Sequence, residues 1–565
     1  MGGISEIWRA RGEVDALRLH EAEQLGLAPV VTEVVAARTT GDLSAFLTPS
    51  VRQLPSPDLL PDMDTSAQRL ADAVQAGERV TVFGDYDADG CTASAVLYRF
   101  LSQLGCPVQV RLPHRLKDGY GLAASMVDQL AAGADVLITV DCGATAFEAL
   151  ERAQALGLPT IVCDHHSVAD SIPPAVGVIN PKRADNSYPP GEPAAVGVAW
   201  NLALWTRKVL RDRGYFRDGA EPDVEALLAL VAVGTVADMV PLTGANRVFV
   251  RRGLRELERT PFVGLHVLKE GARDAELTER SLGFDVAPRL NAAGRLADAD
   301  LAFRLLVTDD PTEARALYEQ LDALNADRRK LQRDTVGEVM RRVREVEQVP
   351  DCIVAYDPQW HPGVVGLAAG RLVEHYHRPA VVIGMQGKGS ARAPEGVNLV
   401  AALRSAQGEL ERYGGHHAAA GLTLKAEARL ARLRAELNLA VREQLGEVGH
   451  QKVVLYDAEL PPWEAHLGVA QQLRQVAPFG MANPVPVLLA RRLTVLQRKD
   501  YKSDFTRFAV AAPTQQRQIW MDGFRIGRAA DRGAVVDVLY EVQIDRYKGE
   551  LQARRRVIAL REAQA

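Results

Sequence analysis

Short apolar runs alternate with longer amphipathic stretches over residues 78–180. The runs are rich in β-branched residues, as buried strands are, while apolar residues in the stretches between them recur every three or four positions, as in helices. Strands that alternate with helices of this length indicate βαβ units and a parallel sheet covered on both faces. The predicted strands are residues 79–84, 108–113, 135–140 and 160–163.

The pattern changes twice further along the chain. Residues 311–348 are highly charged, with Leu and Val every three or four positions, which predicts a helix between two domains, although a short, imperfect coiled coil would give a similar pattern. A second α/β pattern follows, and six β-rich runs from residue 453 onward predict a small barrel or sandwich. We therefore expect an α/β protein with an N-terminal segment at 1–60 that packs on the catalytic domain, a parallel-sheet catalytic domain at 61–310, a connecting helix at 311–348, a smaller α/β domain at 349–447 and a β-barrel domain at 448–565.

Composition places the chain among globular proteins. Its 565 residues are too many for one core, and the apolar fraction of 47% and charged fraction of 25% argue against wholesale disorder. The longest apolar stretch, 226–237, is too short to span a bilayer, and the first ten residues lack the apolar core of a signal peptide. The five cysteines form no CxxC pair, which disfavours a disulfide framework or a zinc ribbon. We expect a cytoplasmic protein with no membrane partner.

The net charge of −5 hides a gradient along the chain. Residues 451–565 hold 18 of the 67 Lys and Arg and 12 of the 72 Asp and Glu, a net of +6, which leaves −11 for the preceding residues. A basic module on an acidic body suits an anionic polymer as partner. A solvated basic face with no partner would give the same numbers.

Acidic residues and histidines follow the predicted strands at the points where they end. Ligands of open α/β sheets bind beyond the carboxyl ends of the strands, so these side chains should meet at one edge. Carboxylates gathered so closely are best tolerated around a cation, and oxygen ligands with imidazole suit Mn²⁺ or Mg²⁺. Two such ions about 3.5–4 Å apart would serve phosphoryl transfer. The residues are Asp85, Asp87 and Asp89 after the first strand, Asp141 after the third, Asp164, His165 and His166 after the fourth, and Asp238 after the apolar run that ends at residue 237.

Neither an EF-hand loop nor a simple helix cap accounts for the whole of this pattern. The Asp-rich turn resembles the start of an EF-hand loop, but Val96 stands where the twelfth-position Glu is needed. A capped helix start would explain the turn by itself, but not the acids and histidines after the other strands. No GxGxxG, P-loop or GxSxG motif accompanies the strands.

The motifs together resemble the DHH phosphoesterases, a family named for the triplet that stands here at 164–166, and in particular bacterial exonucleases specific for single-stranded DNA. Further matching motifs are VFGDYDADG, PHRLKDGYGL, VGTVADMVPL and PRLNAAGRL in the first domain, and HPGVVGLAAGRL, GSARAPEGVNL and GGHHAAAGL in the second, the last resembling the associated DHHA1 domain. The resemblance implies a DHH domain joined by a long helix to a DHHA1 domain, followed by an OB-fold. It spans nearly the whole chain.

The resemblance also assigns roles within the catalytic domain. Metal ligands are expected at Asp87, Asp89, Asp141, His165 and Asp238, with Asp141 bridging two ions. Asp85 matches the first acid of its motif, where it would orient ligands or bind metal indirectly, and His166 is expected to contact the scissile phosphate. Asp164 would orient a histidine, as metal-bound imidazoles usually require.

Substrate-binding residues are expected on both sides of the cleft. Arg115, Ser390 and Arg392 are candidates for holding a terminal 5′ phosphate, because a guanidinium can contact two phosphate oxygens at once. Arg289, Asn291 and Arg295 are expected to line the same path, and His416 and His417 to meet the backbone near the cut. In the barrel, aromatic and basic side chains should bind single strands. That cluster comprises Arg491, Arg492, Arg498, Lys499, Tyr501, Lys502, Phe505, Arg507 and Phe508.

The resemblance implies a Mn²⁺- or Mg²⁺-dependent exonuclease that degrades single-stranded DNA from the 5′ end to 5′-mononucleotides in DNA repair and recombination. Expected partners are 5′-phosphorylated single strands, a single-strand-binding protein and a helicase, and the protein is expected to be a monomer. One alternative is a small-substrate phosphodiesterase of the same family, acting on nano-RNA or cyclic dinucleotides, or a pyrophosphatase. The other is a non-catalytic DNA-binding scaffold, against which the full set of metal ligands argues.

Overall fold

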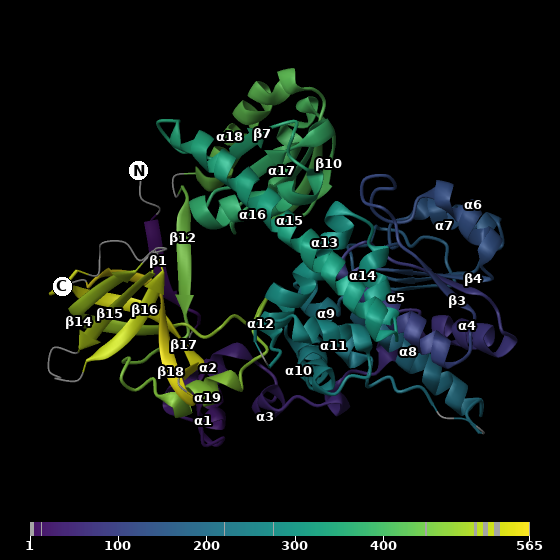
Figure 1. Cartoon of the computed structure of the whole chain (residues 1–565), viewed down its shortest axis with the longest axis horizontal. Coiled ribbons are helices and arrows are strands. Elements are labelled where there is room, and N and C mark those ends of the chain that lie inside the picture. Colours follow the sequence, from purple (N-terminus) through teal and green to yellow (C-terminus); the bar gives the residue numbers. More distant parts are fainter. Residues whose placement is uncertain are drawn as a thin grey trace.

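The first predicted α/β region forms a five-stranded parallel sheet in the computed structural model (Figure 1). The four predicted strands are confirmed to within two residues, and a fifth strand of three residues was not predicted. The strand order is β3-β2-β4-β5-β6, with β2 Val80–Phe83, β3 Val108–Arg111, β4 Val136–Val140, β5 Thr160–Cys163 and β6 Gly177–Ile179. The structure describes residues 5–12, 14–217, 219, 221–274, 276–446, 449–501, 505–511, 518–524, 531–547 and 549–563.

Helices cover both faces of this sheet, and β2, β4 and β5 are buried throughout, as their nearly continuous apolar runs predict. Alternate side chains point to opposite faces, so that Val82 and Ile138 belong to one core cluster and Phe83 and Leu137 to the other. Helices α4 (Met63–Ala76), α5 (Ala88–Gln103) and α8 (Ala195–Asp212) cover the first face, and α6 (Ala124–Gly133) and α7 (Phe147–Ala155) cover the second. The remaining helices of this domain are α9 (Leu228–Ala237), α10 (Gly244–Glu258), α11 (Val263–Glu270), α12 (Glu279–Ser281), α13 (Ala287–Leu296) and α14 (Asp300–Val307).

The charged segment is one helix, α15 (Pro311–Arg344), with Asp310 as its N-cap. It packs against α13 of the first domain and α16 of the second, so that it links the two (Figure 1). The prediction of a connecting helix is therefore confirmed, although the helix ends four residues early.

The second domain contains a mixed five-stranded sheet with the order β10-β11-β9-β8-β7. Its strands are β7 (Ile353–Tyr356), β8 (Ala380–Ile383), β9 (Lys388–Arg392), β10 (Leu410–Gly415) and β11 (Ala419–Leu424), and its helices are α16 (Pro362–Tyr376), α17 (Leu399–Ser405) and α18 (Leu430–Leu445). Only β7 and β8 run parallel, so that the motif carrying Ser390 and Arg392 lies on an antiparallel strand.

The C-terminal strands form a closed barrel, because β14 pairs with β17 in addition to β15. The elements are β13 (Ala458–Glu459), β14 (Leu488–Tyr501), β15 (Phe505–Ala511), β16 (Ile519–Phe524), β17 (Val535–Tyr547) and β18 (Glu550–Glu562), with α19 (Leu467–Arg474). The first β-rich run predicted for this domain forms two strands, β12 (Gln451–Tyr456) and β13. Of these, β12 is not a strand of the barrel sheet but pairs in parallel with β1 (Ser5–Ala10).

The N-terminal segment does not pack as predicted. Helices α1 (Ala16–Glu23), α2 (Pro29–Arg38) and α3 (Leu43–Leu47) share one apolar core with the barrel, whereas residues 51–60 lie on the catalytic core. The buried Asp457 carboxylate reinforces this contact by accepting hydrogen bonds from Arg11 and Arg38. The expectation that all of 1–60 packs on the catalytic domain is therefore wrong for α1 and α2, which pack on the barrel, while Phe46 of α3 also contacts Arg247 of the catalytic domain. Among the described helices, none has the length and apolarity needed to cross a membrane.

Candidate active site

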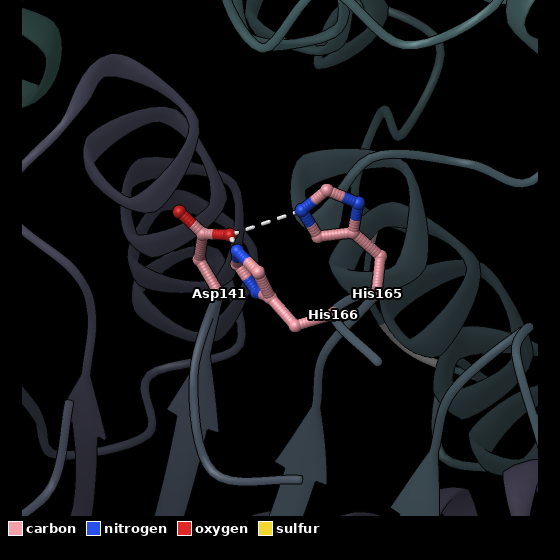
Figure 2. Close-up of side chains that lie close together, drawn as sticks. All are labelled: Asp141, His165 and His166. Atoms are coloured by element: carbon pink, nitrogen blue, oxygen red, sulfur yellow. Dashed lines mark ion pairs between the residues drawn. The ribbon is translucent and has the colours of Figure 1, made fainter. Parts of the chain in front are cut away.

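The predicted acids and histidines meet at the carboxyl edge of the parallel sheet. Asp85 follows β2, Asp141 follows β4, and Asp164 and His165 follow β5, all of them buried. Asp238 ends α9 at the same place. Figure 2 shows Asp141 beside the two histidines, with a ring nitrogen of each imidazole turned toward one oxygen of its carboxylate.

His165 lies at the centre of the group. Carboxylate oxygens surround its Nε2 atom at 3.3 Å (Asp141), 3.5 Å (Asp238) and 3.9 Å (Asp89). Burial and the neighbouring His166 lower the pKa of His165 to about 4, so the ring is neutral, which is the form that binds a metal ion.

Within the described residues, the side-chain atoms that could bind a metal ion form three groups, and Asp141 and His165 each belong to two of them. Potential ligand atoms of Asp89, His165 and Asp238 all lie within 4.8 Å of one another, and the same holds for Asp85, Asp87 and Asp141. Asp141 also forms such a group with the two histidines. The arrangement suits two cations, with Asp141 between them.

Several of these atoms have no hydrogen-bond partner although they are buried: Asp85 Oδ1, Asp141 Oδ1 and His165 Nε2. An unpartnered buried polar atom costs free energy, which a cation would recover. Burial and nearby acids raise the pKa of Asp85 and Asp141, that of Asp89 to about 7 and that of Asp238 to about 9. Both observations fit a divalent metal ion bound among oxygen ligands.

The local backbone explains how Asp87 and Asp89 are held. One Asp87 oxygen caps α5 by accepting from the amides of Asp89 and Gly90. Asp89 accepts from the amides of Ala195 and Val196 at the start of α8, at 2.7 and 3.0 Å. Asp89 therefore has a second, structural task that sequence analysis missed, because its partners lie more than a hundred residues away.

Asp164 holds the second histidine. Its Oδ1 atom lies 2.8 Å from His166 Nδ1 and accepts from the amides of His165 and His166, while Oδ2 accepts from the Ala144 amide. Burial would raise the pKa of Asp164, but the hydrogen bond and charge of His166 outweigh it and hold the pKa at about 2. Asp164 is thus an ionised acid that fixes the orientation of the His166 ring.

The two arginines predicted to bind the phosphate, Arg115 and Arg392, converge between the two domains with Arg295, which was predicted to line the path. Arg115 stacks on Tyr86 and donates to the Gly294 carbonyl, and Arg392 donates to the Ala391 carbonyl. Burial lowers the pKa of Arg295 to about 10, helped by the positive charges of Arg115, Arg328 and Arg392. Guanidinium groups that lie this close together, each with a backbone carbonyl as partner, would suit an anion. Arg328, from α15, was missed because that helix carries many arginines.

Arg289 and Asn291 have structural partners that the sequence did not reveal. Arg289 pairs with Asp322 of α15 at 2.8 Å and donates to the Asp285 carbonyl, while Asn291 accepts from the Ala88 amide beside the metal-ligand loop. They hold α13 against α15 and α5. That they also line the substrate path stays a prediction.

The DHHA1-type motifs lie on the second domain. Ser390 lies on β9 beside Arg392, and His416 and His417 occupy the turn between β10 and β11. The two histidines line a cavity of about 680 Å³ together with Asn398 and Arg404.

The barrel cluster is only partly as expected. Phe508 is fully buried and cannot stack on a base, whereas Phe505 contacts Tyr501 and Phe524 at ring-centroid distances of 5.5 and 4.9 Å. Arg491, Arg498 and Arg507 pair with acids of the barrel domain, and Lys502 lies outside the described residues. A cavity of about 360 Å³, which the sequence did not indicate, lies where the catalytic domain faces the barrel. It is lined by Arg280, Asp522, Phe524, Gln543, Arg554 and Arg556.

Comparisons with protein families follow the same division of the chain. The model of the DHH family N-terminal domain matches residues 79–235, the DHHA1 domain matches 350–443, and the RecJ OB domain matches 456–558. The fold and the site therefore define a DHH-family protein with a DHHA1 domain.

Within this class the chain is similar to curated RecJ exonucleases. The single-stranded-DNA-specific exonuclease RecJ of Escherichia coli K12 is 37% identical over 501 residues, covering 85% of this chain and 86% of its own, and that of Bacillus subtilis 168 is 32% identical over 539 residues, covering 93% and 67%. The chain belongs to the RecJ family. A crystal structure of RecJ from Thermus thermophilus in complex with Mn²⁺ matches with a TM-score of 0.86 and 29% identity, over 99% of this chain and 80% of that chain.

Proposed function

We propose that this protein is a metal-dependent exonuclease that hydrolyses single-stranded DNA from the 5′ end to 5′-mononucleotides, acting in DNA repair and recombination. The observation that carries the proposal is the cluster of buried acids and imidazoles at the carboxyl edge of the sheet, with ligand atoms that lack hydrogen-bond partners. Its occurrence in a chain that matches RecJ exonucleases over most of their length supports single-stranded DNA as the substrate.

Asp87, Asp89, Asp141, His165 and Asp238 would hold Mn²⁺ or Mg²⁺, with Asp85 beside them. Two such ions would supply an activated water and neutralise charge on the phosphate as the bond breaks. The neutral ring of His165 leaves Nε2 available as a ligand. Solved RecJ structures hold Mn²⁺ or Mg²⁺, which supports the same choice here.

His166 would contact the scissile phosphate. Burial lowers the pKa of His166, but the hydrogen bond and charge of Asp164 outweigh it and raise the pKa above its ordinary value. A protonated imidazole donates a charge-assisted hydrogen bond to a phosphate oxygen, and Asp164 keeps the ring in place for it.

The arginines between the two domains would bind the 5′ end of the strand. Arg115, Arg295 and Arg392 can surround a terminal 5′ phosphate, with Ser390 adding a hydroxyl donor from β9. His416 and His417 would meet the following backbone. The barrel, with its basic residues and the aromatic group of Tyr501, Phe505 and Phe524, would hold the rest of the strand.

The decisive experiment compares strands that differ only at the 5′ end. With Mn²⁺ and labelled oligonucleotides, 5′-phosphorylated single strands should be degraded from the 5′ end and faster than 5′-hydroxyl strands, while duplexes resist. Arg392→Ala should remove most of this preference, because one charge-assisted contact is worth about 1.5–3 kcal/mol, or roughly tenfold to a hundredfold in kcat/KM. Arg392→Lys should rescue only part of it.

Arg371→Ala is a matched control, because Arg371 is an exposed arginine of the same domain that pairs with Glu374. It should behave like the parent. An unchanged phosphate preference in Arg392→Ala would rule out the pocket. Cleavage of dinucleotides without cleavage of long strands would favour the small-substrate alternative instead.

A further inference from the structure

The loop between β3 and α6 places one tyrosine against the centre of the candidate site. Tyr120 stands between Gly119 and Gly121, which have φ angles of +85° and +78°. Such left-handed backbone on both sides is readily adopted by glycine and turns the tyrosine toward the strand end after β4. Leu122 of the same loop belongs to one core cluster with Cys142, so the loop is packed in place.

The Tyr120 hydroxyl makes contacts to two site residues. It donates a hydrogen bond to the Asp141 carbonyl oxygen at 3.2 Å, and it lies 3.2 Å from Nδ1 and 3.4 Å from Nε2 of His166. The two rings meet edge to face at a centroid distance of 5.7 Å. One hydroxyl therefore connects the acid placed between the two ligand groups with the histidine beside it.

Asp141 needs such support because of its backbone. Its φ angle is +62°, a left-handed conformation that non-glycine residues rarely adopt and that persists only when the surroundings enforce it. On one side, its amide donates to the Cys163 carbonyl of the neighbouring strand at 3.0 Å. On the other side, Tyr120 holds its carbonyl. The direction of the Asp141 carboxylate depends on this peptide geometry.

We propose that Tyr120 is a positioning residue, whose hydroxyl fixes the left-handed backbone of Asp141 and the adjacent His166 ring so that Asp141 can bridge two divalent cations. This inference rests on the proposed function for its catalytic consequence, but not for its effect on metal binding. The side chain is 56% exposed, so the ring contributes little to the core and its hydroxyl can be removed without disturbing the fold.

Tyr120→Phe removes only the hydroxyl. Mn²⁺ binding is measured by the Mn²⁺ concentration that gives half of the metal-induced rise in melting temperature, a readout independent of activity. We expect this concentration to rise about tenfold and kcat on 5′-phosphorylated single strands to fall by a similar factor at saturating Mn²⁺, the size of effect typical of groups that support metal ligands. KM and the melting temperature without metal should stay close to those of the parent.

Tyr215→Phe is the matched control, because the Tyr215 hydroxyl also donates to a backbone carbonyl, that of Leu104, at 3.4 Å and outside the site. It should leave every value unchanged. The inference is overturned if Tyr120→Phe keeps kcat and the Mn²⁺ midpoint within twofold of the parent, if only KM changes, or if the metal-free melting temperature falls well below that of the control. A parent protein without nuclease activity would refute the proposed function, while the Mn²⁺ midpoint would still decide the role of Tyr120.

Discussion

Individual acids of the site carry protons that ordinary carboxyl groups would have lost. Burial, followed by the charges of neighbouring acids, raises the pKa of Asp89 to about 7 and of Asp238 to about 9, and raises that of Asp141 as well. Without a cation, the folded protein therefore binds protons above pH 4 that an unfolded chain releases. Its stability should fall as the pH rises toward 9, by about 1.4 kcal/mol per pH unit for each retained proton.

Asp141→Asn tests this dependence of stability on pH. The variant has one acid fewer in the cluster, so in EDTA its melting temperature should fall less than that of the parent between pH 6 and pH 9. Mn²⁺ should stabilise the parent more at pH 9 than at pH 6, because cations displace the retained protons, and it should stabilise the variant little. Hydrolysis should be lost while binding to single strands persists.

Asp128→Asn serves as the comparison, because Asp128 is a surface acid that pairs with Arg152. Its melting temperature should follow the parent at every pH. A metal-free parent whose stability is flat from pH 6 to 9 would show that the cluster is not protonated, and turnover of Asp141→Asn within tenfold of the parent would exclude a bridging role.

Most of the acids and histidines that meet in the site follow strands of the parallel sheet, and Asp238, which ends α9, is an exception. Asp85, Asp141 and His165 were predicted to meet because carboxyl ends of parallel strands lie at one edge. Arg289 and Asn291 belong to a helix whose packing partners, α15 and the start of α5, cannot be read from local pattern. Their supporting contacts are therefore visible only in the folded chain, while the place along the substrate path that their motif implies stays a prediction.

At the scale of elements, the sequence predicts strands that have a clear local pattern, but it does not predict which distant strands pair. Strands β2, β4 and β5 were predictable because parallel strands covered on both faces are nearly continuous apolar runs, whereas the edge strand β3 alternates apolar and polar residues. The pairing of β12 with β1 was not, since the partners lie 446 residues apart and each run alone is compatible with a barrel strand. The three-residue β6 is too short to give a pattern at all.

One contact between elements of the two domains should control the phosphate pocket. Gly363 near the start of α16 faces the end of α13, where a Cβ atom on Gly363 would stand 2.3 Å from the Arg295 carbonyl oxygen. Gly363→Ala should therefore push α16 away from Arg295 and lower kcat/KM on 5′-phosphorylated strands about a hundredfold, as small displacements in an active site can. Kinetics on 5′-phosphoryl and 5′-hydroxyl strands measure the effect.

Gly370→Ala lies on the same helix with no neighbouring atom within 4 Å of the added Cβ. It should keep full activity and gain up to about 1 kcal/mol of stability, because alanine is the better helix former. If Gly363→Ala and Gly370→Ala have the same kcat/KM on 5′-phosphorylated strands, the contact between α13 and α16 does not position the phosphate pocket.

For the whole molecule, the barrel is inseparable from the N-terminus. Helices α1 to α3 fill one core with the barrel, and buried Arg247 of α10 donates to carbonyls of Phe46, Gln475 and Val476, which ties this unit to the catalytic domain. Arg474 and Glu279 add an ion pair across the same boundary. The barrel lies apart from the DHHA1-type domain in Figure 1, with β12 spanning the distance between them.

Removing residues 451–565 alone should therefore leave the apolar faces of α1 to α3, including Val31, Val34 and Val35, without the surface on which they pack. Because large exposed apolar patches promote association, the product should aggregate, which light scattering measures. A soluble monomer after this single deletion would show that the N-terminal helices do not depend on the barrel.

Removing residues 1–50 as well should give a soluble catalytic unit, because residues from 51 onward pack on the catalytic core. This unit retains the metal cluster and the arginine pocket and should still cleave short oligonucleotides. It should bind long single strands more weakly, with a shallower dependence on salt, since the slope of log K against log salt falls by about 0.7 for every phosphate that is no longer neutralised. Binding titrations at several salt concentrations measure this slope. Affinity and slope equal to those of the full chain would show that the barrel does not hold DNA, and its role would then be confined to burying the apolar faces of α1 to α3.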